Sequence, residues 1–157
     1  MIIRINHRNR KQVITFFEQH WGSTKMVVST GTYDCTNLDG WVYVENQQIV
    51  GLITYTVKGR TLEIVSLDSM REGAGIGSAL VAHVETFAKQ QQLQTIQLIT
   101  TNDNLHALKF YQKRGYRVTA VIVDAVKKAR HIKPTIPLKG YDDIPLHDEF
   151  MLEKILT

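Results

Sequence analysis

The spacing of apolar residues changes near the middle of the chain, and this change constrains the fold more than any other feature. Three segments, separated by two short turns, carry apolar side chains at about every second position: residues 41–45, 49–57 and 62–67. That period is typical of strands that pair as antiparallel neighbours. The next segment, 75–91, has the spacing of an amphipathic helix, with one apolar stripe formed by Ile76, Leu80, Val84, Phe87 and Ala88.

Weaker patterns extend this order in both directions. Strands are predicted over 2–5, 95–101, 116–123 and 147–155, and helices over 7–21 and 105–114. Residues 23–40 fit no single period and allow a short helix, whereas 130–147 contain all three prolines and are expected to form a long loop. A crossover through the helix at 75–91 makes the strands before and after it parallel neighbours. We therefore predict one domain over 1–157, an α/β fold with a mixed sheet and helices on both faces.

The composition narrows the class of protein. No run of 18 or more apolar residues occurs, so no membrane-spanning helix is expected. The formal charge is +4, but the basic residues are scattered and have no interleaved aromatics, which suits an anionic cofactor better than nucleic acid. Cys35 is the single cysteine and cannot form an internal disulfide, and the N-terminus lacks a secretory pattern, so a cytoplasmic location is expected.

Two groups of polar residues are interpreted as carrying no chemistry. The six histidines show no metal-ligand spacing, so no metal is expected. Asp148 and Glu149 are interpreted as the solvated edge of the last strand rather than as a catalytic pair.

A glycine-rich segment leads into the helix over 75–91. Its residues are Gly73, Ala74, Gly75, Ile76, Gly77 and Ser78. The first N–H groups of a helix have no partners inside it, and the helix dipole makes this end positive, so the segment suits a diphosphate. A Walker A loop requires a lysine that is missing here, and a dinucleotide-binding fingerprint requires glycine where Leu80 stands. A tight turn without a ligand is the simpler alternative.

A second motif follows the next predicted strand. Asn102, Asp103 and Asn104 are three candidate caps for the helix that comes after it. Asn104, Ala107 and Tyr111 lie on one face of that helix, since they are three and four residues apart. The face combines an amide, a small side chain that permits close approach, and a phenol. Taken alone, it also fits a capped helix in which Tyr111 only packs.

Together the two motifs resemble the acetyl-CoA-binding core of the GNAT superfamily of N-acetyltransferases. The first family motif, Q/R-x-x-G-x-G/A, is similar to residues 72–77. The second, N-x-x-A-x-x-x-Y followed by G-F/Y, is similar to Asn104, Ala107, Tyr111, Gly115 and Tyr116. One departure is Glu72, which stands at the Q/R position. A carboxylate is unfavourable near a diphosphate, and Arg71 is expected to offset it.

This resemblance implies the GNAT acyl-CoA N-acyltransferase fold, with a mostly antiparallel sheet and one splayed parallel pair of strands. It implies an acetyl-CoA-dependent N-acetyltransferase in which an amine attacks the thioester directly. The cofactor-binding residues that it implies are Val65, Ser66, Leu67, Gly73, Ala74, Gly75, Ile76, Gly77, Ser78, Asn104, Ala107 and Tyr111. The Leu67 N–H is the candidate donor to the oxyanion, and Tyr111 the candidate acid that protonates the leaving thiolate.

Glu63 is the candidate base that accepts the proton of the amine. It is acidic in an otherwise apolar strand, and alternation predicts that it shares a face with Val65 and Leu67. Histone-acetylating members of the superfamily are similar here, with a catalytic Glu that begins an E-I-V run. Pairing of Glu63 with a cation, or a water held by Asp68 or Glu45, are the alternatives.

Two other functions stay open at this point: a non-catalytic acyl-CoA sensor and a basic nucleic-acid-binding module. The sequence does not identify the acceptor, and small amines, amino acids, antibiotics, polyamines and protein amines all fit, as does O-acetylation. The loop over 130–147 is long enough to line an acceptor pocket. A homodimer that pairs through an exposed sheet edge is compatible with the pattern.

Overall fold

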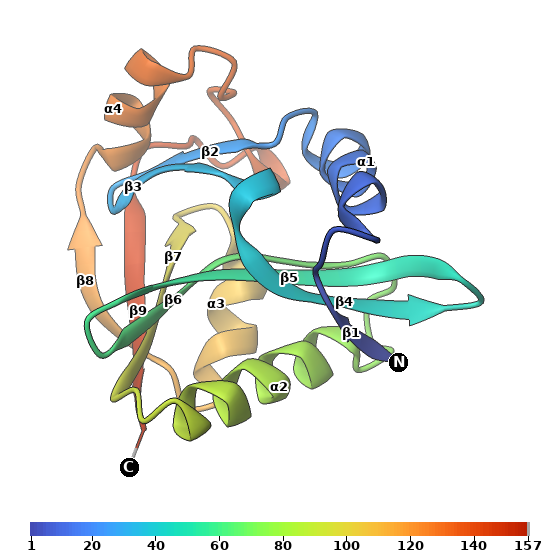
Figure 1. Cartoon of the computed structure of the whole chain (residues 1–157). Helices are drawn as coiled ribbons and strands as arrows, with labels where there is room; N and C mark the ends of the chain where they lie inside the picture. Colours follow the sequence, from blue (N-terminus) through green and yellow to red (C-terminus); the bar gives the residue numbers. More distant parts are fainter. Residues whose placement is uncertain (157) are drawn as a thin grey trace. The chain divides into compact units, whose positions relative to one another are not determined.

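The computed structural model describes residues 1–156 (Figure 1). These residues form two compact units, which are described one after the other. The first unit comprises residues 1–26, 33–96 and 156, and the second comprises 27–32 and 97–155.

The first unit is built on four strands that are antiparallel throughout. They are β1 (Ile2–Arg4), β4 (Asp39–Glu45), β5 (Gln48–Lys58) and β6 (Thr61–Ser69), in the spatial order β1-β4-β5-β6. Two tight turns join the last three, with Asn46, Gln47 and Gly59 at positive φ. The antiparallel meander predicted from the period of two is therefore confirmed.

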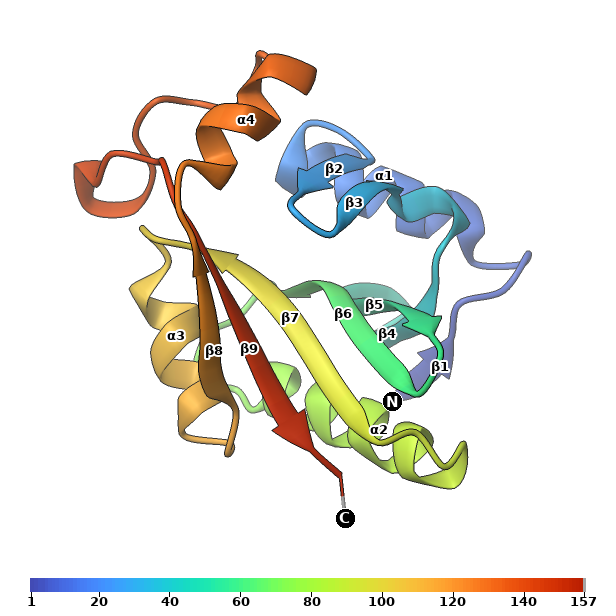
Figure 2. The same ribbon diagram turned by 90° about the vertical axis from the view of Figure 1, so that its left-hand side faces the viewer.

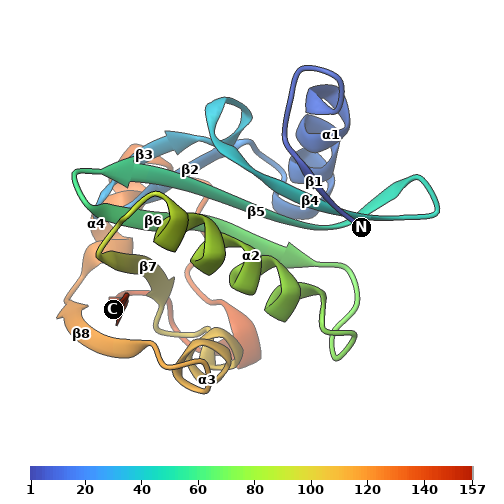
Figure 3. The same ribbon diagram turned by 60° about the horizontal axis from the view of Figure 1, so that its bottom comes forward.

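Two helices cover opposite faces of these strands (Figures 1 and 3). They are α1 (Arg10–Trp21) and α2 (Ile76–Gln90). Phe16 and Phe17 of α1 belong to the same buried cluster as Val42. Trp41, the next residue along β4, instead contacts the Phe87 ring of α2 at 5.1 Å between centroids. Because successive strand residues point to opposite sides, the sheet has an α1 face and an α2 face.

Gly51 allows α2 to lie close to the sheet. A Cβ atom built on Gly51 would clash with the Ile76 side chain and lie 3.2 Å from Leu80 Cδ1. Both of these residues are buried in the first two turns of α2. A side chain at position 51 would therefore push away the end of α2 that carries the glycine-rich segment.

A β-bulge interrupts β6. Thr54 of β5 pairs with Ser66, whereas the next residue, Tyr55, pairs with Ile64, so Val65 is an extra residue on β6. An extra residue reverses the alternation of side chains on one side of the bulge. This reversal decides which face of the sheet Glu63 occupies.

The second unit contains three further strands and two helices. The strands are β7 (Thr95–Thr101, of which 97–101 belong here), β8 (Arg117–Ile122) and β9 (Glu149–Ile155), in the order β7-β9-β8, with β8 and β9 antiparallel. Helix α3 (Leu105–Gln112) packs beside β8, and α4 (Ala125–Ile132) follows β8 in the chain (Figure 2). The strand predicted over 95–101 and the helix predicted over 105–114 are both found.

Helix α4 corrects the prediction of a loop that begins at residue 130. Its buried stripe is short, with Ala125, Val126 and Ala129, and four of its other five residues are basic, so the sequence signal was weak. Arg130 donates hydrogen bonds to the carbonyl oxygens of Ile136, Pro137 and Leu146. The following segment is thereby held against α4, and it contains a short 3₁₀ helix, η2 (Tyr141–Asp143).

Residues 23–40 form a hairpin and not only the short helix that the sequence allowed. The hairpin consists of β2 (Lys25–Val28) and β3 (Gly31–Asp34), and a 3₁₀ helix, η1 (Cys35–Asn37), follows it. Each strand has only four residues, too few for a period of two to stand out.

The elements confirm the predicted fold class: mixed α/β, with mostly antiparallel strands and one parallel pair. The splay of that pair and the single domain over 1–157 stay predictions. None of the helices within residues 1–156 is long and apolar enough to cross a membrane.

Candidate active site

The glycine-rich segment forms the N-terminus of α2. Gly73 and Gly75 have φ of +74° and +77°, and Gly75 is the N-cap residue of the helix. A Cβ atom at either position would meet no atom within 4 Å, so the left-handed backbone, and not a lack of space, favours glycine. The first helical bond runs from the Ala79 N–H to the Gly75 carbonyl at 3.0 Å. In any α-helix the first N–H groups have no acceptor within the helix, so this end is suited to an anion.

The contacts of Arg71 do not support the expectation that it offsets the negative charge of Glu72. Its guanidinium bonds the carboxylate of Glu45 on β4, and both side chains are exposed. A surface pair of this kind contributes about 0–1 kcal/mol to stability. The positive charge of Arg71 is therefore already matched by a carboxylate. Glu45 is correspondingly a weaker candidate for holding a catalytic water.

The bulge at Val65 corrects the predicted face of Glu63. Leu67 pairs with Ile53, which pairs with Trp41, so Leu67 lies on the α2 face. On β5, Leu52 belongs to the cluster on the α1 side, and Thr54 and Thr56 follow at every second position, so they point to the same side. Glu63 is the residue of β6 that pairs with Thr56. Glu63 therefore lies on the α1 face, the side on which Val65 also packs, as predicted for that pair, and not on the face of Leu67. Strict alternation was the wrong assumption, because the extra residue shifts the pattern by one.

Two other polar residues of β6 share the α1 face with Glu63. Ser66 is buried and its hydroxyl lies 2.5 Å from that of Thr54. Asp68 accepts a hydrogen bond from the Trp21 indole N–H at 2.7 Å. Burial raises the pKa of Asp68, and the Trp21 bond opposes that rise.

Glu63 is enclosed and has a phenol as a partner. The residue is 6% exposed, and the hydroxyl of Tyr33 donates to its Oε2 at 3.3 Å. Tyr33 belongs to β3, a segment that carries no recognisable sequence signal of function. Only the tertiary structure brings these two residues together, 30 positions apart.

The second motif lies on α3 as predicted. The Asn104 side-chain oxygen accepts the Ala107 N–H at 3.1 Å, so Asn104 is the N-cap among the three candidates. Tyr111 is 5% exposed, and its ring meets those of Phe110 and Tyr116 edge-on at 5.1 and 5.3 Å. The cap and the aromatic contacts fix the axis and the rotation of this helix.

The other two candidate caps hold the segment between α4 and β9. The Asn102 side-chain oxygen accepts the N–H groups of His147 and Asp148, both at 3.0 Å. Asp103 is buried and accepts the Tyr141 N–H at 2.9 Å. A chain segment that was predicted to be a long loop is thus anchored to the residues just before α3.

Glu149 and Asp148 are not a solvated edge. Glu149 is 1% exposed and accepts the N–H of Ser29 at 2.9 Å. Asp148 accepts the N–H of Asp124, the N-cap of α4, at 2.8 Å, and this bond is the main cause that lowers the Asp148 pKa, with the His147 ring also contributing. Both carboxylates therefore hold backbone in place. The sequence did not indicate this, since the N–H groups that they accept lie 120 and 24 positions away along the chain.

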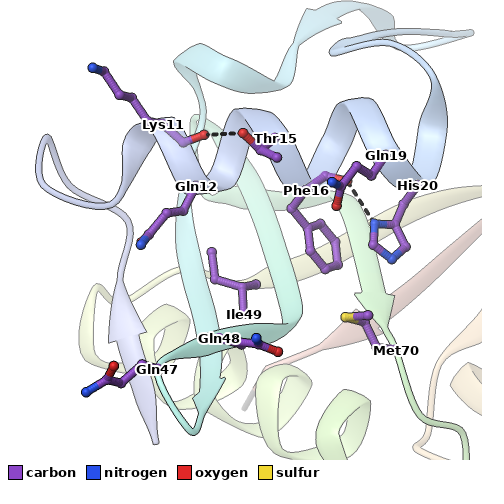
Figure 4. A pocket seen from close by; sticks show the side chains of 10 residues that line it. All are labelled: Lys11, Gln12, Thr15, Phe16, Gln19, His20, Gln47, Gln48, Ile49 and Met70. Atoms are coloured by element: carbon purple, nitrogen blue, oxygen red, sulfur yellow. Dashed lines mark hydrogen bonds between the residues drawn. The ribbon is translucent and has the colours of Figure 1, made fainter.

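The predicted site residues fall into two groups. Glu63, the 65–67 segment and the glycine-rich segment belong to the first unit, and Asn104, Ala107 and Tyr111 to the second. Neither group lines either of two pockets on the first unit. One, of about 460 Å³, lies between α1 and the β4–β5 turn, where Figure 4 shows Phe16, His20 and Met70 among the lining side chains. The other, of about 520 Å³, lies beside Tyr55 and Phe87.

Within the described part of the chain, no group of three or more His, Cys, Asp or Glu side chains is arranged to hold a metal. The absence of a metal stays a prediction.

The family model of the Acetyltransferase (GNAT) family matches residues 8–116. The chain belongs to this family. The match includes both the glycine-rich segment and the α3 motif, and it confirms the predicted family and an enzyme that transfers acetyl groups. The matched region runs from the residues just before α1 to the residues just after α3.

Two relatives are similar over nearly the whole chain, both uncharacterized proteins of Bacillus subtilis strain 168. YxbD is 50% identical over 145 residues, which cover 92% of this chain and 91% of YxbD. YdhI is 48% identical over 158 residues, which cover 99% of each chain.

Solved acetyltransferase structures have the same fold. A Bacillus subtilis acetyltransferase in complex with CoA has a TM-score of 0.71 and 18% identity, covering 99% of this chain and 98% of that chain. A GNAT family acetyltransferase from Elizabethkingia anophelis with acetyl-CoA bound has a TM-score of 0.71 and 17% identity, covering 99% and 97%. The predicted GNAT fold is confirmed.

Proposed function

We propose that this enzyme binds acetyl-CoA at the N-terminus of α2 and transfers the acetyl group to an amine by direct attack in a ternary complex. The observation that carries the proposal is the left-handed glycine segment capping α2, inside the region that matches the GNAT family. The CoA and acetyl-CoA complexes of proteins with the same fold support the choice of cofactor.

In this proposal the diphosphate of acetyl-CoA is bound by backbone N–H groups from Gly73 to Ser78, in the field of the α2 dipole. The backbone of Val65, Ser66 and Leu67 pairs with the pantetheine arm. The side chain of Ser66 is engaged by Thr54, so its backbone is the part assigned to the cofactor. On α3, Asn104 uses its oxygen as the helix cap, so its amide N–H₂ is the group assigned to acetyl-CoA, beside Ala107.

The reaction requires a donor to the oxyanion, an acid for the leaving thiolate and a base for the amine. The nitrogen lone pair of the acceptor attacks the thioester carbonyl, and the developing oxyanion needs a donor, which we assign to the Leu67 N–H. The C–S bond then breaks, and the thiolate takes a proton from the Tyr111 hydroxyl. The proton lost by the amine goes to Glu63, directly or through one water. Tyr111 and Glu63 are thus the proposed catalytic residues.

The proposed acceptor is a small amine or a protein amine. The proposal also includes a cytoplasmic location and no metal. Pairing of two copies through a sheet edge stays a separate prediction, to be measured by light scattering of the purified protein.

The experiment that tests the function is a screen for thiol release. The purified enzyme and acetyl-CoA are mixed with polyamines, amino acids, aminoglycosides, or peptides that carry a free N-terminus or lysine, and free CoA is measured. Release that depends on one acceptor class supports the proposal. Binding of acetyl-CoA by calorimetry without release from any acceptor would indicate a sensor. A salt-sensitive shift with DNA and no acetyl-CoA binding would indicate a nucleic-acid-binding module.

A further inference from the structure

The hairpin formed by β2 and β3 supplies a residue that touches the proposed base. The hydroxyl of Tyr33, in β3, donates a hydrogen bond to Glu63 Oε2 at 3.3 Å, and both residues belong to the first unit. We propose that Tyr33 is a positioning residue, which orients the Glu63 carboxylate for accepting the proton of the amine. The inference rests on the proposed function, in which Glu63 is that acceptor.

The backbone next to Tyr33 is fixed on its C-terminal side. Asp34 caps η1 by accepting the Thr36 N–H at 3.0 Å and the Thr36 hydroxyl at 2.7 Å, and these bonds lower the pKa of Asp34. The Cys35 N–H donates to the Thr24 carbonyl at 2.8 Å, and the Cys35 side chain is fully buried in the cluster beneath α1. The phenol therefore extends from a backbone held by a cap, a hydrogen bond and a buried side chain.

The position of Glu63 is fixed from the sheet side. The Val65 bulge sets Glu63 on the α1 face, where a strictly alternating β6 would place it on the opposite side. Bulges commonly re-aim a side chain beside a functional site. Without the bulge, the hydroxyl of Tyr33 and the carboxylate of Glu63 would not meet. The contact thus depends on two separate irregularities of the chain, the bulge in β6 and the turn into η1.

A phenol is chemically suited to this task. A buried carboxylate without a donor is costly, and a hydrogen bond to its charged form favours ionisation. A bond to one carboxylate oxygen also restricts rotation of the group, which fixes the direction of the lone pairs that receive a proton. Phenylalanine would fill the same space without supplying a donor. The hydroxyl of Tyr33, and not its ring, is therefore the functional part.

The charged groups that share this face must be considered in any pH measurement. On β5, Thr56 pairs with Glu63 and carries no charge, whereas Lys58 lies two residues further on the same face. On β6 itself, Asp68 occupies the same face beyond the bulge. A change that arises from Glu63 must therefore persist when Asp68 is replaced by Asn.

The first test is Tyr33→Phe, assayed for acetyl transfer to the best acceptor of the screen. We expect kcat to fall roughly tenfold to a hundredfold, the range for misplacing a catalytic group by about 1 Å, with KM for acetyl-CoA unchanged. The acidic limb of the kcat profile is expected to move to higher pH, because the carboxylate loses a donor to its charged form. Tyr43→Phe, which removes a hydroxyl from β4, is the matched control and should leave kcat and the profile unchanged. Thermal unfolding of both variants monitors the fold.

A double-mutant cycle separates the failure of this inference from the failure of the proposed function. If Glu63→Gln keeps wild-type turnover, Glu63 is not the base and the catalytic assignment is wrong. If Glu63→Gln is strongly impaired but Tyr33→Phe has wild-type kcat and an unmoved acidic limb, only the role of Tyr33 is overturned. If Tyr33→Phe lowers kcat equally in the wild-type and Glu63→Gln backgrounds, Tyr33 acts elsewhere and the inference also fails. A Tyr33 effect that vanishes in the Glu63→Gln background supports it.

Discussion

Replacement of Gly75 tests the proposed diphosphate site most directly. The residue caps α2 with φ of +77° and ψ of 6°, and a Cβ atom there would meet no protein atom within 4 Å. A new side chain therefore adds no clash within the protein, and its effects reduce to backbone strain and charge. Left-handed backbone costs a non-glycine residue about 1–2 kcal/mol, with Asn and Asp tolerating it best.

The charge effect can be isolated by comparing Gly75→Asp with Gly75→Asn. The two side chains have nearly the same shape and the same backbone preference, so strain cancels in the comparison. One unit charge at about 4 Å from another costs about 1 kcal/mol in water and about 4 kcal/mol at an effective dielectric constant of about 20. With about 1.4 kcal/mol per tenfold change, Gly75→Asp should bind acetyl-CoA about 5-fold to 1,000-fold more weakly than Gly75→Asn.

The assay is calorimetric titration with acetyl-CoA at about 0.05 M and about 1 M salt. The ratio of the two dissociation constants should shrink at high salt, since the Debye length falls to about 3 Å at 1 M. Thermal unfolding establishes that both variants are folded. Equal affinity of the Asp and Asn variants at low salt would refute an anion site at this helix end, and wild-type affinity in both would remove acetyl-CoA from the α2 N-terminus altogether.

Three further predictions concern single side chains. Tyr111→Phe keeps the ring contacts and should lower turnover by roughly 10²–10⁴ while acetyl-CoA affinity changes little; nearly full turnover would make Tyr111 a packing residue. Asn104→Ala should lower the free energy of unfolding by about 0.5–2 kcal/mol and weaken acetyl-CoA binding. Asn104→Ser should restore the helix cap but not the affinity for acetyl-CoA. Restored affinity in Asn104→Ser would contradict a contact through the amide. Burial raises the pKa of Asp68 in the folded state. The contribution of Asp68 to folding stability is therefore complete below its unfolded pKa of about 3.9, and it is lost as the pH rises through the folded-state pKa. Asp68→Asn, which can still accept the Trp21 bond, should therefore be more stable than wild type to urea at pH 7, with the gain absent near pH 3; a loss at pH 7 would contradict this sign.

Local sequence was sufficient for the elements that depend on short-range rules. The meander, α2 and the strand over 95–101 follow from apolar periods that persist for five residues or more. The glycine-rich segment was also readable, because glycine adopts the positive φ found at the start of α2 more readily than any other residue. The Asn104 cap belongs to the same class, since a capping side chain bonds an N–H three residues away.

Features that depend on distant partners could not be read from the chain. Helix α4 has a buried stripe of only three small residues, and Arg130 stabilises it through carbonyl groups up to 16 positions away. Glu149 appeared to be a solvated carboxylate, yet it is buried and accepts the N–H of Ser29, which lies 120 residues earlier in the sequence. Neither of these distant partners can be recognised from the local sequence pattern.

The face of Glu63 shows the same division most clearly. The sequence determined that an acidic residue lies in the strand before α2, and the alternation rule then assigned it to the face of Leu67. Only the pairing of β5 with β6 decided where the strand bulges, since a bulge is defined by which residues of the neighbouring strand are opposite. One extra residue at Val65 reversed the face and brought Glu63 to Tyr33. Residue types and periods are local properties of the chain, whereas register belongs to a pair of strands, and that is why the tertiary structure alone could settle it.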